Sequence, residues 1–240
     1  MIYNSTGQPR DNWTTIRPMT TGYFWRGAAD NPNRGKIEHI DWTQVEGMIA
    51  DRSGEHLVIN IEGDGWERPG DDGNEQRLDN WVSLIQRVRE MHECGTLGVY
   101  RMVPRRAFWE PVKHAEGSDS GGIHKKWRLA NNRTYRMAAH VDIIHPSLYW
   151  WEGERCTPEA MEVYYKSNIT EAQQYEKPVV PYLSPTYAGM DTYPLIPTEI
   201  VRTQCELLKA GGVSDIVVFA SKASGCPDQH ADIYTEYFGD

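Results

Sequence analysis

The sequence contains the stretch Leu57-Val58-Ile59-Asn60-Ile61-Glu62-Gly63-Asp64-Gly65-Trp66, an apolar run that ends in two acids, two glycines and a tryptophan. Side chains alternate across a β-strand, so the aliphatic residues at odd positions share one face and the residues at even positions share the other. The even-numbered face becomes polar toward its end, at Glu62 and Asp64. This gradient predicts a barrel strand whose outer face packs on helices and whose inner face opens into a site at its carboxyl end.

The rest of the chain alternates short apolar runs with helical patterns from about residue 20 onward, which is typical of βα repeats. The predicted strands are 22–26, 56–62, 97–103, 141–148, 178–183 and 215–220, and the predicted helices are 41–51, 76–93, 132–140, 158–175 and 198–210. The sequence lacks GxGxxG after its first predicted strand and lacks GxxxxGK[ST], so a nucleotide-binding open sheet loses its usual support. We predict an α/β fold, a TIM-like (β/α) barrel that is irregular and has seven or eight strands.

The domain organisation follows from length and composition. The chain has 240 residues, of which 39% are hydrophobic and 25% charged, and this suits one large domain. We predict a single (β/α)-barrel catalytic domain over residues 1–240, with a long lid-like loop at about 104–132. The tryptophans of that loop, Trp109 and Trp127, are typical of a binding segment, and the alternative is a surface excursion that contacts no ligand.

Charge and hydropathy exclude two classes of partner. The net charge of −9 argues against nucleic acid, and no apolar run approaches the roughly 20 residues of a membrane span. The start of the chain has neither a basic region nor an apolar core, so the sequence as it stands predicts no secretion signal. We expect a secreted or periplasmic protein if a leader has been removed and a cytoplasmic protein otherwise. The sequence specifies no oligomeric state.

Neither a metal nor a cofactor is predicted. The four cysteines lack CxxC spacing and are predicted to be mostly free, with one bridge between Cys156 and Cys226 left open as an alternative. The eight histidines are scattered along the chain. His114, Asp119 and His124 form the one cluster with metal-ligating side chains that the spacing indicates.

The acid pair is the strongest indication of chemistry. Glu62 and Asp64 are two residues apart on one strand face, which places their Cα atoms roughly 7 Å apart. Two close carboxylates do not both ionise freely, so the pair supplies an acid and a base, as cleavage of a glycosidic bond requires. The neighbouring glycines leave room for a sugar ring, and Trp66 offers a stacking face. The structural alternative is that one acid pairs with Arg101 or Arg26.

Aromatic residues at other strand ends fit the same interpretation. The chain has nine Trp and thirteen Tyr but only four Phe, and sugar rings stack on the flat faces of Trp and Tyr. A tyrosine hydroxyl near the acid pair stabilises charge or holds a substituent of the substrate. The residues predicted to bind substrate are Trp66, Tyr100, Arg101, Trp109, Tyr182 and Lys222. For each of them alone, an ordinary rim or core position is the alternative.

Three motifs resemble the hyaluronidase family. The stretch Ile61-Glu62-Gly63-Asp64-Gly65-Trp66-Glu67-Arg68-Pro69 is similar to the family's strand in which an acid-x-acid pair is followed by Trp-Arg-Pro. The segments Pro146-Ser147-Leu148-Tyr149 and Lys177-Pro178-Val179-Val180-Pro181-Tyr182 resemble the family's Pro-Ser-x-Tyr strand and its successor. The resemblance implies an irregular barrel that cuts polysaccharides containing N-acetylated amino sugars.

The resemblance also implies roles for single residues. Glu62 takes the position of the acid that orients the acetamide of the substrate as nucleophile, Asp64 that of the proton donor, and Tyr149 that of the residue that assists at the acetamide. The family carries Asp and then Glu, whereas this chain carries Glu and then Asp. The proton donor of this chain is therefore one methylene shorter.

We predict a glycoside hydrolase that acts on a polysaccharide or oligosaccharide, with Glu62, Asp64 and Tyr149 as its catalytic residues. The first alternative is a polysaccharide lyase in which Tyr149 or Tyr100 removes a proton beside a uronic acid. The second is a carbohydrate-binding barrel without catalysis. The third is an aldolase or lyase that forms a Schiff base on Lys222.

Overall fold

The computed structural model describes residues 1–5, 10–11, 13–16, 18–20, 24–25, 36–52, 54–62, 66–92, 95–151, 156–188, 194–220 and 225–239. The strands of this part of the chain are β1 Ile2–Ser5, β2 Thr14–Thr15, β3 Met19–Thr20, β4 Leu57–Asn60, β5 Leu97–Tyr100, β6 Ile143–His145, β7 Tyr182–Leu183 and β8 Ile216–Phe219. The helices are η1 Ile37–His39, α2 Trp42–Ala50, α3 Glu75–Met91, α4 Trp109–Ala115, α5 Ile123–Arg133, α6 Tyr135–Ala138, α7 Pro158–Gln173, α8 Thr198–Ala210 and α9 Asp228–Phe238.

The strands form two parallel four-stranded sheets, in the orders β3-β4-β5-β6 and β2-β1-β8-β7. Single parallel bridges, Ile144 with Val179 and Ser147 with Tyr182, connect the segment of β6 to that of β7 and so join the two sheets. Within the described residues no ladder joins β2 to β3, so the strands form no closed barrel. The predicted α/β class with parallel strands is confirmed, whereas the described strands form two sheets and not the predicted barrel.

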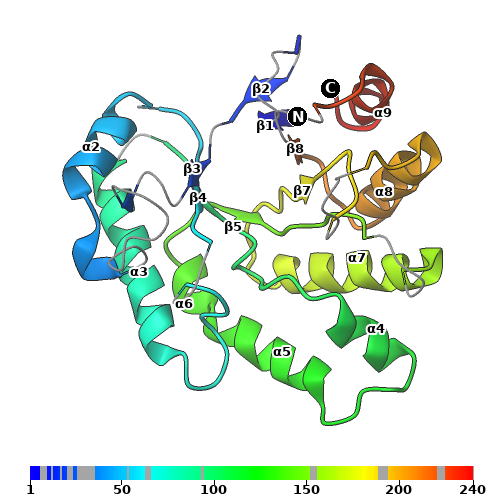
Figure 1. Ribbon diagram of the computed structural model, residues 1–240, viewed down its shortest axis with the longest axis horizontal. Helices are drawn as coiled ribbons and strands as arrows, with labels where there is room; N and C mark the ends of the chain where they lie inside the picture. Colours follow the sequence, from blue (N-terminus) through cyan, green and yellow to red (C-terminus); the bar gives the residue numbers. More distant parts are fainter. Residues whose placement is uncertain are drawn as a thin grey trace.

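The helices surround the strands on the outside, as Figure 1 shows, with α2 and α3 against one sheet and α7, α8 and α9 against the other. Six residues, from both sheets and the segments beside them, form a separate cluster on the inner faces: Ile16, Val58, Tyr100, Val180, Tyr182 and Val217. The strands therefore have the helix-covered outside and side-chain-filled inside of a βα array.

Strand β4 has the two faces that its sequence predicts. Leu57, Ile59 and Ile61 pack in the cluster that includes α3, whereas Val58 belongs to the inner cluster. Glu62 is an even number of residues after Val58, so it falls on the same inner face, and it is exposed. The alternation of the sequence thus correctly places Glu62 beyond the carboxyl end of β4.

Five predicted strands coincide with β4 to β8, although the observed strands are shorter. Most of the predicted strand 22–26 lies outside the described residues, and its described members Phe24 and Trp25 are buried but belong to no strand. The sequence pattern does not predict β1, β2 and β3, because runs of two to four residues contain too little alternation to be recognised.

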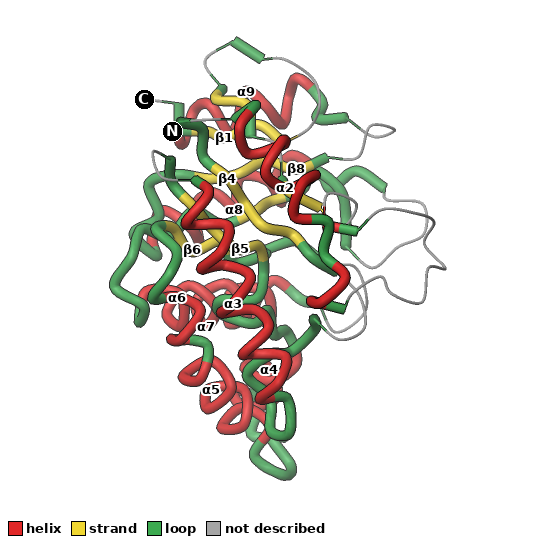
Figure 2. The backbone as a smooth tube through the Cα atoms, turned by 90° about the vertical axis from the view of Figure 1, so that its left-hand side faces the viewer, coloured by secondary structure: helices red, strands yellow, loops and turns green. Residues whose placement is uncertain are grey.

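The prediction of a lid-like loop at about 104–132 is wrong, because most of this segment forms α4 and α5. Both views show the two helices extending away from the strands (Figures 1 and 2). The glycines at 117, 121 and 122 occupy the turn between them, where all three have positive φ, and Asp119 Oδ1 accepts a hydrogen bond from the Ile123 N–H at 2.7 Å. Helix α5 buries Trp127 and Ala130, so the segment is packed rather than lid-like.

Two further sequence predictions concern single chemical features. Cys156 and Cys205 are free thiols, so the bridge from Cys156 to Cys226 is not formed. Among the helices of the described ranges, none combines the length and the apolar character that crossing a membrane requires.

Candidate functional site

Three tyrosines from neighbouring strands meet at the carboxyl end of the sheets. Tyr100 is the last residue of β5, Tyr149 follows β6, and Tyr182 begins β7. The ring centroids of Tyr100 and Tyr182 are 4.8 Å apart, and those of Tyr100 and Tyr149 are 6.4 Å apart. The structure brings together the three tyrosines that the sequence predicts to act in one site, and we call them the tyrosine cluster.

Phe219 extends the tyrosine cluster, although the sequence does not predict it as a site residue. It is the last residue of β8, and its ring stacks on that of Tyr149 at a centroid distance of 6.3 Å and an interplanar angle of 11°. Its side chain is 39% exposed, which is unusual for a phenylalanine at a strand end. Alternation along β8 could have indicated this position, because Phe219 shares the face of Val217, which belongs to the inner cluster.

Ser147 and Arg106 add polar groups to the tyrosine cluster. The Ser147 hydroxyl lies 3.1 Å from the Tyr100 hydroxyl and accepts a hydrogen bond from Arg106 Nη1 at 3.3 Å. The guanidinium carbon of Arg106 lies 4.8 Å from the ring centroid of Trp151. A half-buried cation thus lies beside the phenol hydroxyls, held by a hydrogen bond and a cation–π contact.

Helix α7 fixes the segment that carries Ser147 and Tyr149. The Tyr164 hydroxyl donates to the Ser147 carbonyl at 2.8 Å, and the Tyr165 hydroxyl donates to the Leu148 carbonyl at 2.6 Å. Both tyrosines are fully buried in the core. The backbone of the segment after β6 is therefore anchored to a packed helix, which gives Tyr149 a defined position.

The environment keeps the phenols of Tyr149 and Tyr182 protonated. Burial raises the pKa of Tyr149 well above its ordinary value, and the neighbouring Tyr100 raises it further. Burial, and then Tyr100, likewise raise the pKa of Tyr182. The Tyr182 hydroxyl is buried and has no hydrogen-bond partner among the described residues. Both phenols are protonated at neutral pH and able to donate a hydrogen bond.

Glu62 pairs with Arg101, the residue that follows Tyr100 at the end of β5. Arg101 follows Tyr100 directly, and its Nη1 lies 3.9 Å from Glu62 Oε1. Its Nη2 forms a second, closer ion pair with Glu67. The side chain of Glu62 is 52% exposed, whereas that of Arg101 is 20% exposed. The sequence alternative that one acid pairs with Arg101 therefore holds for Glu62, and Arg101 is engaged by two carboxylates of the protein.

Two predicted site residues, Asp64 and Lys222, lie outside the residues that the structure describes. The separation of the two carboxylates of the acid pair is therefore not part of the described geometry. The roles of Asp64 as proton donor and of Lys222 in substrate binding remain predictions.

Trp66 is a core residue, so the prediction that it stacks on a sugar is wrong. Its side chain is 1% exposed, and its ring packs edge-on against Trp25 and Trp81 at centroid distances of 5.6 and 5.1 Å. Trp81 Nε1 donates to the Trp66 carbonyl at 2.8 Å. The glycine on its N-terminal side suggested an open position, but the aromatic stripe of α3 covers the ring.

We expect Trp66→Phe to lower the free energy of unfolding by about 2 kcal/mol, because the smaller ring leaves a cavity between Trp25 and Trp81. Urea unfolding followed by tryptophan fluorescence and circular dichroism measures this change. The control is Trp109→Phe, which changes an exposed tryptophan and is expected to leave stability within about 0.5 kcal/mol. An unchanged unfolding midpoint in Trp66→Phe would contradict the assignment of Trp66 to the core.

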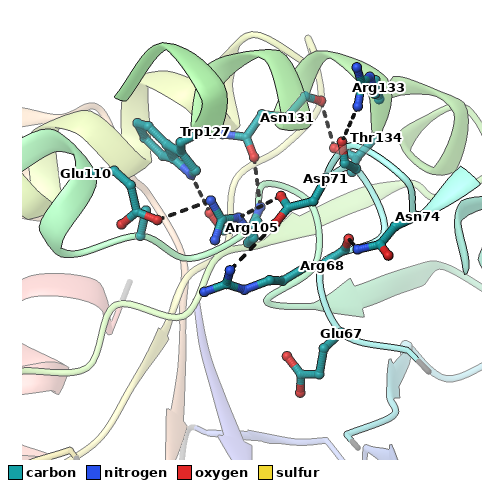
Figure 3. Close-up of polar contacts among 12 residues, drawn as sticks. Glu67, Arg68, Asp71, Asn74, Arg105, Glu110, Trp127, Asn131, Arg133 and Thr134 are labelled. Carbon is teal, nitrogen blue, oxygen red and sulfur yellow. Dashed lines mark hydrogen bonds and ion pairs between the residues drawn. The ribbon is translucent and has the colours of Figure 1, made fainter. Parts of the chain in front are cut away.

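The segment that follows the acid pair is fixed from several sides, as Figure 3 shows. Asn74 Nδ2 donates to the Arg68 carbonyl at 2.9 Å, and Arg133 Nη1 donates to the Gly70 carbonyl at 3.1 Å. Arg105 pairs with Asp71 at 3.7 Å and with Glu110 at 3.1 Å. Side chains of α4 and α5 and of the segment before them thus hold residues 66–74 in place.

The tryptophans of the segment predicted to be a loop have different environments. Trp127 is buried and donates from Nε1 to the Arg105 carbonyl at 2.8 Å, so it is a structural residue. Trp109 is exposed at the start of α4, where its ring packs edge-on against Phe108. Its part in substrate binding stays a prediction.

The predicted histidine cluster does come together at the start of α5. The rings of His114 and His124 stack at a centroid distance of 4.2 Å, and His114 Nδ1 lies 3.6 Å from Asp119 Oδ2. Both oxygens of Asp119 accept hydrogen bonds from backbone N–H groups at the start of α5. Within the described ranges no group of three or more ligating side chains is arranged to hold a metal ion.

Comparison with solved structures finds bee venom hyaluronidase, with a TM-score of 0.63 and 12% sequence identity over 98% of this chain and 96% of that chain. A structure of bee venom hyaluronidase in complex with a hyaluronic acid tetramer gives a TM-score of 0.60 and 14% identity over 94% of this chain and 84% of that chain. The sequence itself matches no protein family and no curated protein.

The likeness extends over nearly the whole chain, so it concerns the arrangement of all the elements and not single motifs. At 12 to 14% identity it shows a shared fold. The α/β fold that the motif resemblance implies is thereby supported, and the activity belongs to the proposal below.

Proposed function

We propose that this protein is a glycoside hydrolase that cleaves a polysaccharide, with Glu62 and Asp64 as its acid pair and Tyr149 as an assisting residue. The observation that carries the proposal is that the tyrosine cluster and Glu62 follow neighbouring parallel strands, and that Arg101, the residue after Tyr100, pairs with Glu62. In βα barrels this is the end at which side chains from several strands combine into one site.

The chemistry of glycoside cleavage matches these groups. The reaction needs a proton for the leaving oxygen and a negative group near the positive charge that develops on the sugar. Glu62 supplies the negative group, and Asp64, two residues later, supplies the proton. The protonated phenols of Tyr149 and Tyr182 donate hydrogen bonds to sugar substituents, and the exposed ring of Phe219 offers an apolar face for stacking.

The proposed substrate class is a glycan that contains N-acetylated amino sugars. Two lines of support are the motif resemblance and the fold shared with bee venom hyaluronidase, which has been crystallised with a hyaluronic acid tetramer. An acetamide oxygen accepts hydrogen bonds, and the half-buried Tyr149 carries a protonated phenol that is able to donate one.

A lyase mechanism is disfavoured by the environment of the phenols. A tyrosine that removes a proton near neutral pH needs a pKa lowered toward that range. Burial instead raises the pKa of Tyr149, and Arg106, the cation that opposes this shift, acts more weakly than burial does. Tyr149 is therefore a hydrogen-bond donor rather than a base.

The function is tested with the purified protein on hyaluronan, chitin oligosaccharides and a polymer without amino sugars. We expect new reducing ends from a substrate with N-acetylated amino sugars and no ultraviolet absorbance from an unsaturated product. Unsaturated ends would indicate the lyase. Binding by calorimetry with no change in chain length would indicate the carbohydrate-binding barrel and contradict the hydrolase.

We expect Tyr149→Phe to lower kcat/KM about 100-fold, because it removes one hydroxyl that donates a hydrogen bond at the reacting sugar. Initial rates of reducing-end formation measure the change. Tyr135→Phe removes the hydroxyl of an exposed tyrosine on α6 and serves as the control, with an expected change of less than about twofold. Equal activities of the two variants would remove Tyr149 from the mechanism.

A further inference from the structure

Arg101 has a backbone conformation that is rare for its residue type. Its φ is +54°, in the left-handed region that favours glycine, and Arg68 in the neighbouring loop has a φ of +52°. The Arg101 N–H donates to the His145 carbonyl at 3.0 Å, and the Arg101 carbonyl accepts from the Arg106 N–H at 3.3 Å. Backbone strain persists where the surroundings determine the conformation, and such positions are frequent at functional sites.

The side chain of Arg101 joins two carboxylates that come from one loop. Nη2 is paired with Glu67, and Nη1 lies 3.9 Å from Glu62. The closer partner, Glu67, belongs to a segment whose backbone is fixed by α3. Arg77 Nη1 donates to the Glu67 carbonyl at 2.9 Å, and Trp81 Nε1 donates to the preceding carbonyl, that of Trp66, at 2.8 Å.

These contacts are connected in series. Side chains of α3 fix the backbone of Glu67, Glu67 pairs with Arg101, and Arg101 pairs with Glu62. The side chain of Glu62 is 52% exposed, so packing alone does not define its position. A guanidinium that is already held by one carboxylate loses less conformational entropy when it holds a second one. Arg101 is therefore preorganised to restrain Glu62.

We propose that Arg101 is a positioning residue, braced by Glu67, that holds the Glu62 carboxylate in place for the reaction. This role differs from the predicted role of Arg101 in substrate binding, and it rests on the proposed glycoside hydrolase activity. A carboxylate displaced by about 1 Å from its reactive geometry costs about 100-fold in rate. The effect of losing Arg101 should therefore appear in kcat, whereas loss of a binding residue should raise KM.

The test compares Arg101→Gln, Arg101→Lys and Glu67→Gln in steady-state cleavage of hyaluronan or whichever glycan of the panel is cut. We expect Arg101→Gln to lower kcat about 100-fold with KM within about threefold, and Glu67→Gln to lower kcat about 10-fold. The kcat of Arg101→Lys should be about 10-fold higher than that of Arg101→Gln, because lysine restores the positive charge but not the planar guanidinium that pairs with two carboxylates. The double variant Arg101→Gln/Glu67→Gln should be no slower than Arg101→Gln, because both changes interrupt the same series of contacts to Glu62.

Two further measurements separate this proposal from a structural role and from the proposed function. Arg136→Gln on α6 breaks an exposed ion pair with Asp79 of α3 and should leave kcat unchanged. Crystal structures of the wild type and Arg101→Gln should show the Glu62 carboxylate displaced or disordered in the variant. An unmoved Glu62, or an unchanged kcat in an active enzyme, overturns the positioning role. A wild type that cleaves no glycan overturns the proposed function, and the crystal structures still decide the role of Arg101.

Discussion

We expect the free energy of unfolding to fall by several kcal/mol when the pH is lowered from about 7 to about 4.5, because a buried and a half-buried histidine are held neutral as a pair. His56 Nε2 lies 2.8 Å from His145 Nε2, inside the strand array. His56 Nδ1 lies 2.6 Å from the Thr96 hydroxyl, and His145 Nδ1 lies 2.7 Å from the Val180 carbonyl. The pair links the segments of β4, β5, β6 and β7.

The hydrogen bonds determine the tautomer of both rings. The Val180 carbonyl only accepts, so His145 Nδ1 carries the proton and its Nε2 is an acceptor. His56 Nε2 must then donate, and His56 Nδ1 accepts from the Thr96 hydroxyl. Every ring nitrogen is engaged with each ring neutral. A proton added to His145 Nε2 has to break the bond between the two rings, whereas one added to His56 Nδ1 requires the Thr96 hydroxyl to turn and accept. Gly98 makes room for the pair, because a Cβ at that position would lie 2.3 Å from His145 Cδ2.

The pKa values agree with this geometry. Burial lowers the pKa of His56 from 6.5 to about 4, with Asp142 and the Thr96 bond opposing and His92 adding to the shift. Burial, and then His56, lower the pKa of His145 from 6.5 to about 3, with the Val180 bond opposing. The folded pKa values lie below the unfolded one, so the stabilisation is complete above pH 6.5 and is lost as the pH falls through about 4. The two rings contact each other directly, so the loss on acidification belongs to the pair as a whole.

Urea unfolding at a series of pH values measures this dependence. His56→Gln keeps a donor and an acceptor but does not titrate, and we expect it to remove about half of the loss on acidification. His39→Asn, an exposed histidine on η1, is the control and should leave the dependence unchanged. A wild type that loses less than about 1 kcal/mol between these pH values would contradict the neutral pair. The loss is large against the 5 to 15 kcal/mol that stabilises most domains.

The sequence predicts those parts of this protein that depend on local alternation. The run before Glu62 identifies β4, its two faces and the exposed acid at its end, and the same reasoning places Tyr100, Tyr149 and Tyr182 at neighbouring strand ends. All of these follow from the period of two along a strand.

What the sequence does not predict depends on contacts between distant segments. Trp66 follows two acids and a glycine, and only the approach of Trp25 and Trp81 shows that it is buried. Similarly, the sequence does not predict α4 and α5, because the glycines between these helices suggest a loop. Packing of Trp127 stabilises α5, the helix that follows the glycines. The histidine pair joins residues 56 and 145, and nothing local in the sequence indicates it.

The largest effect on activity is expected from Glu62→Gln, which should lower kcat at least about 1,000-fold, corresponding to about 4 kcal/mol of transition-state stabilisation. Gln has nearly the same shape but carries no charge, so it offers no negative group to the developing positive charge on the sugar. The variant should fold normally, because the side chain is 52% exposed and its ion pair with Arg101 is long, at 3.9 Å. Such a pair contributes little to stability.

The measurement combines initial rates on the cleaved glycan with thermal unfolding of the same preparations. Glu90→Gln, which changes an exposed glutamate on α3, is the matched control and should retain full kcat. The order of the two acids makes the comparison with Asp64→Asn informative. A proton donor at Asp64 should be bypassed by substrates with a good leaving group, which need no protonation, whereas the loss of Glu62 should persist on the same substrates. Recovery of Glu62→Gln on an activated substrate, with Asp64→Asn remaining inactive, would exchange the two roles and make Glu62 the proton donor.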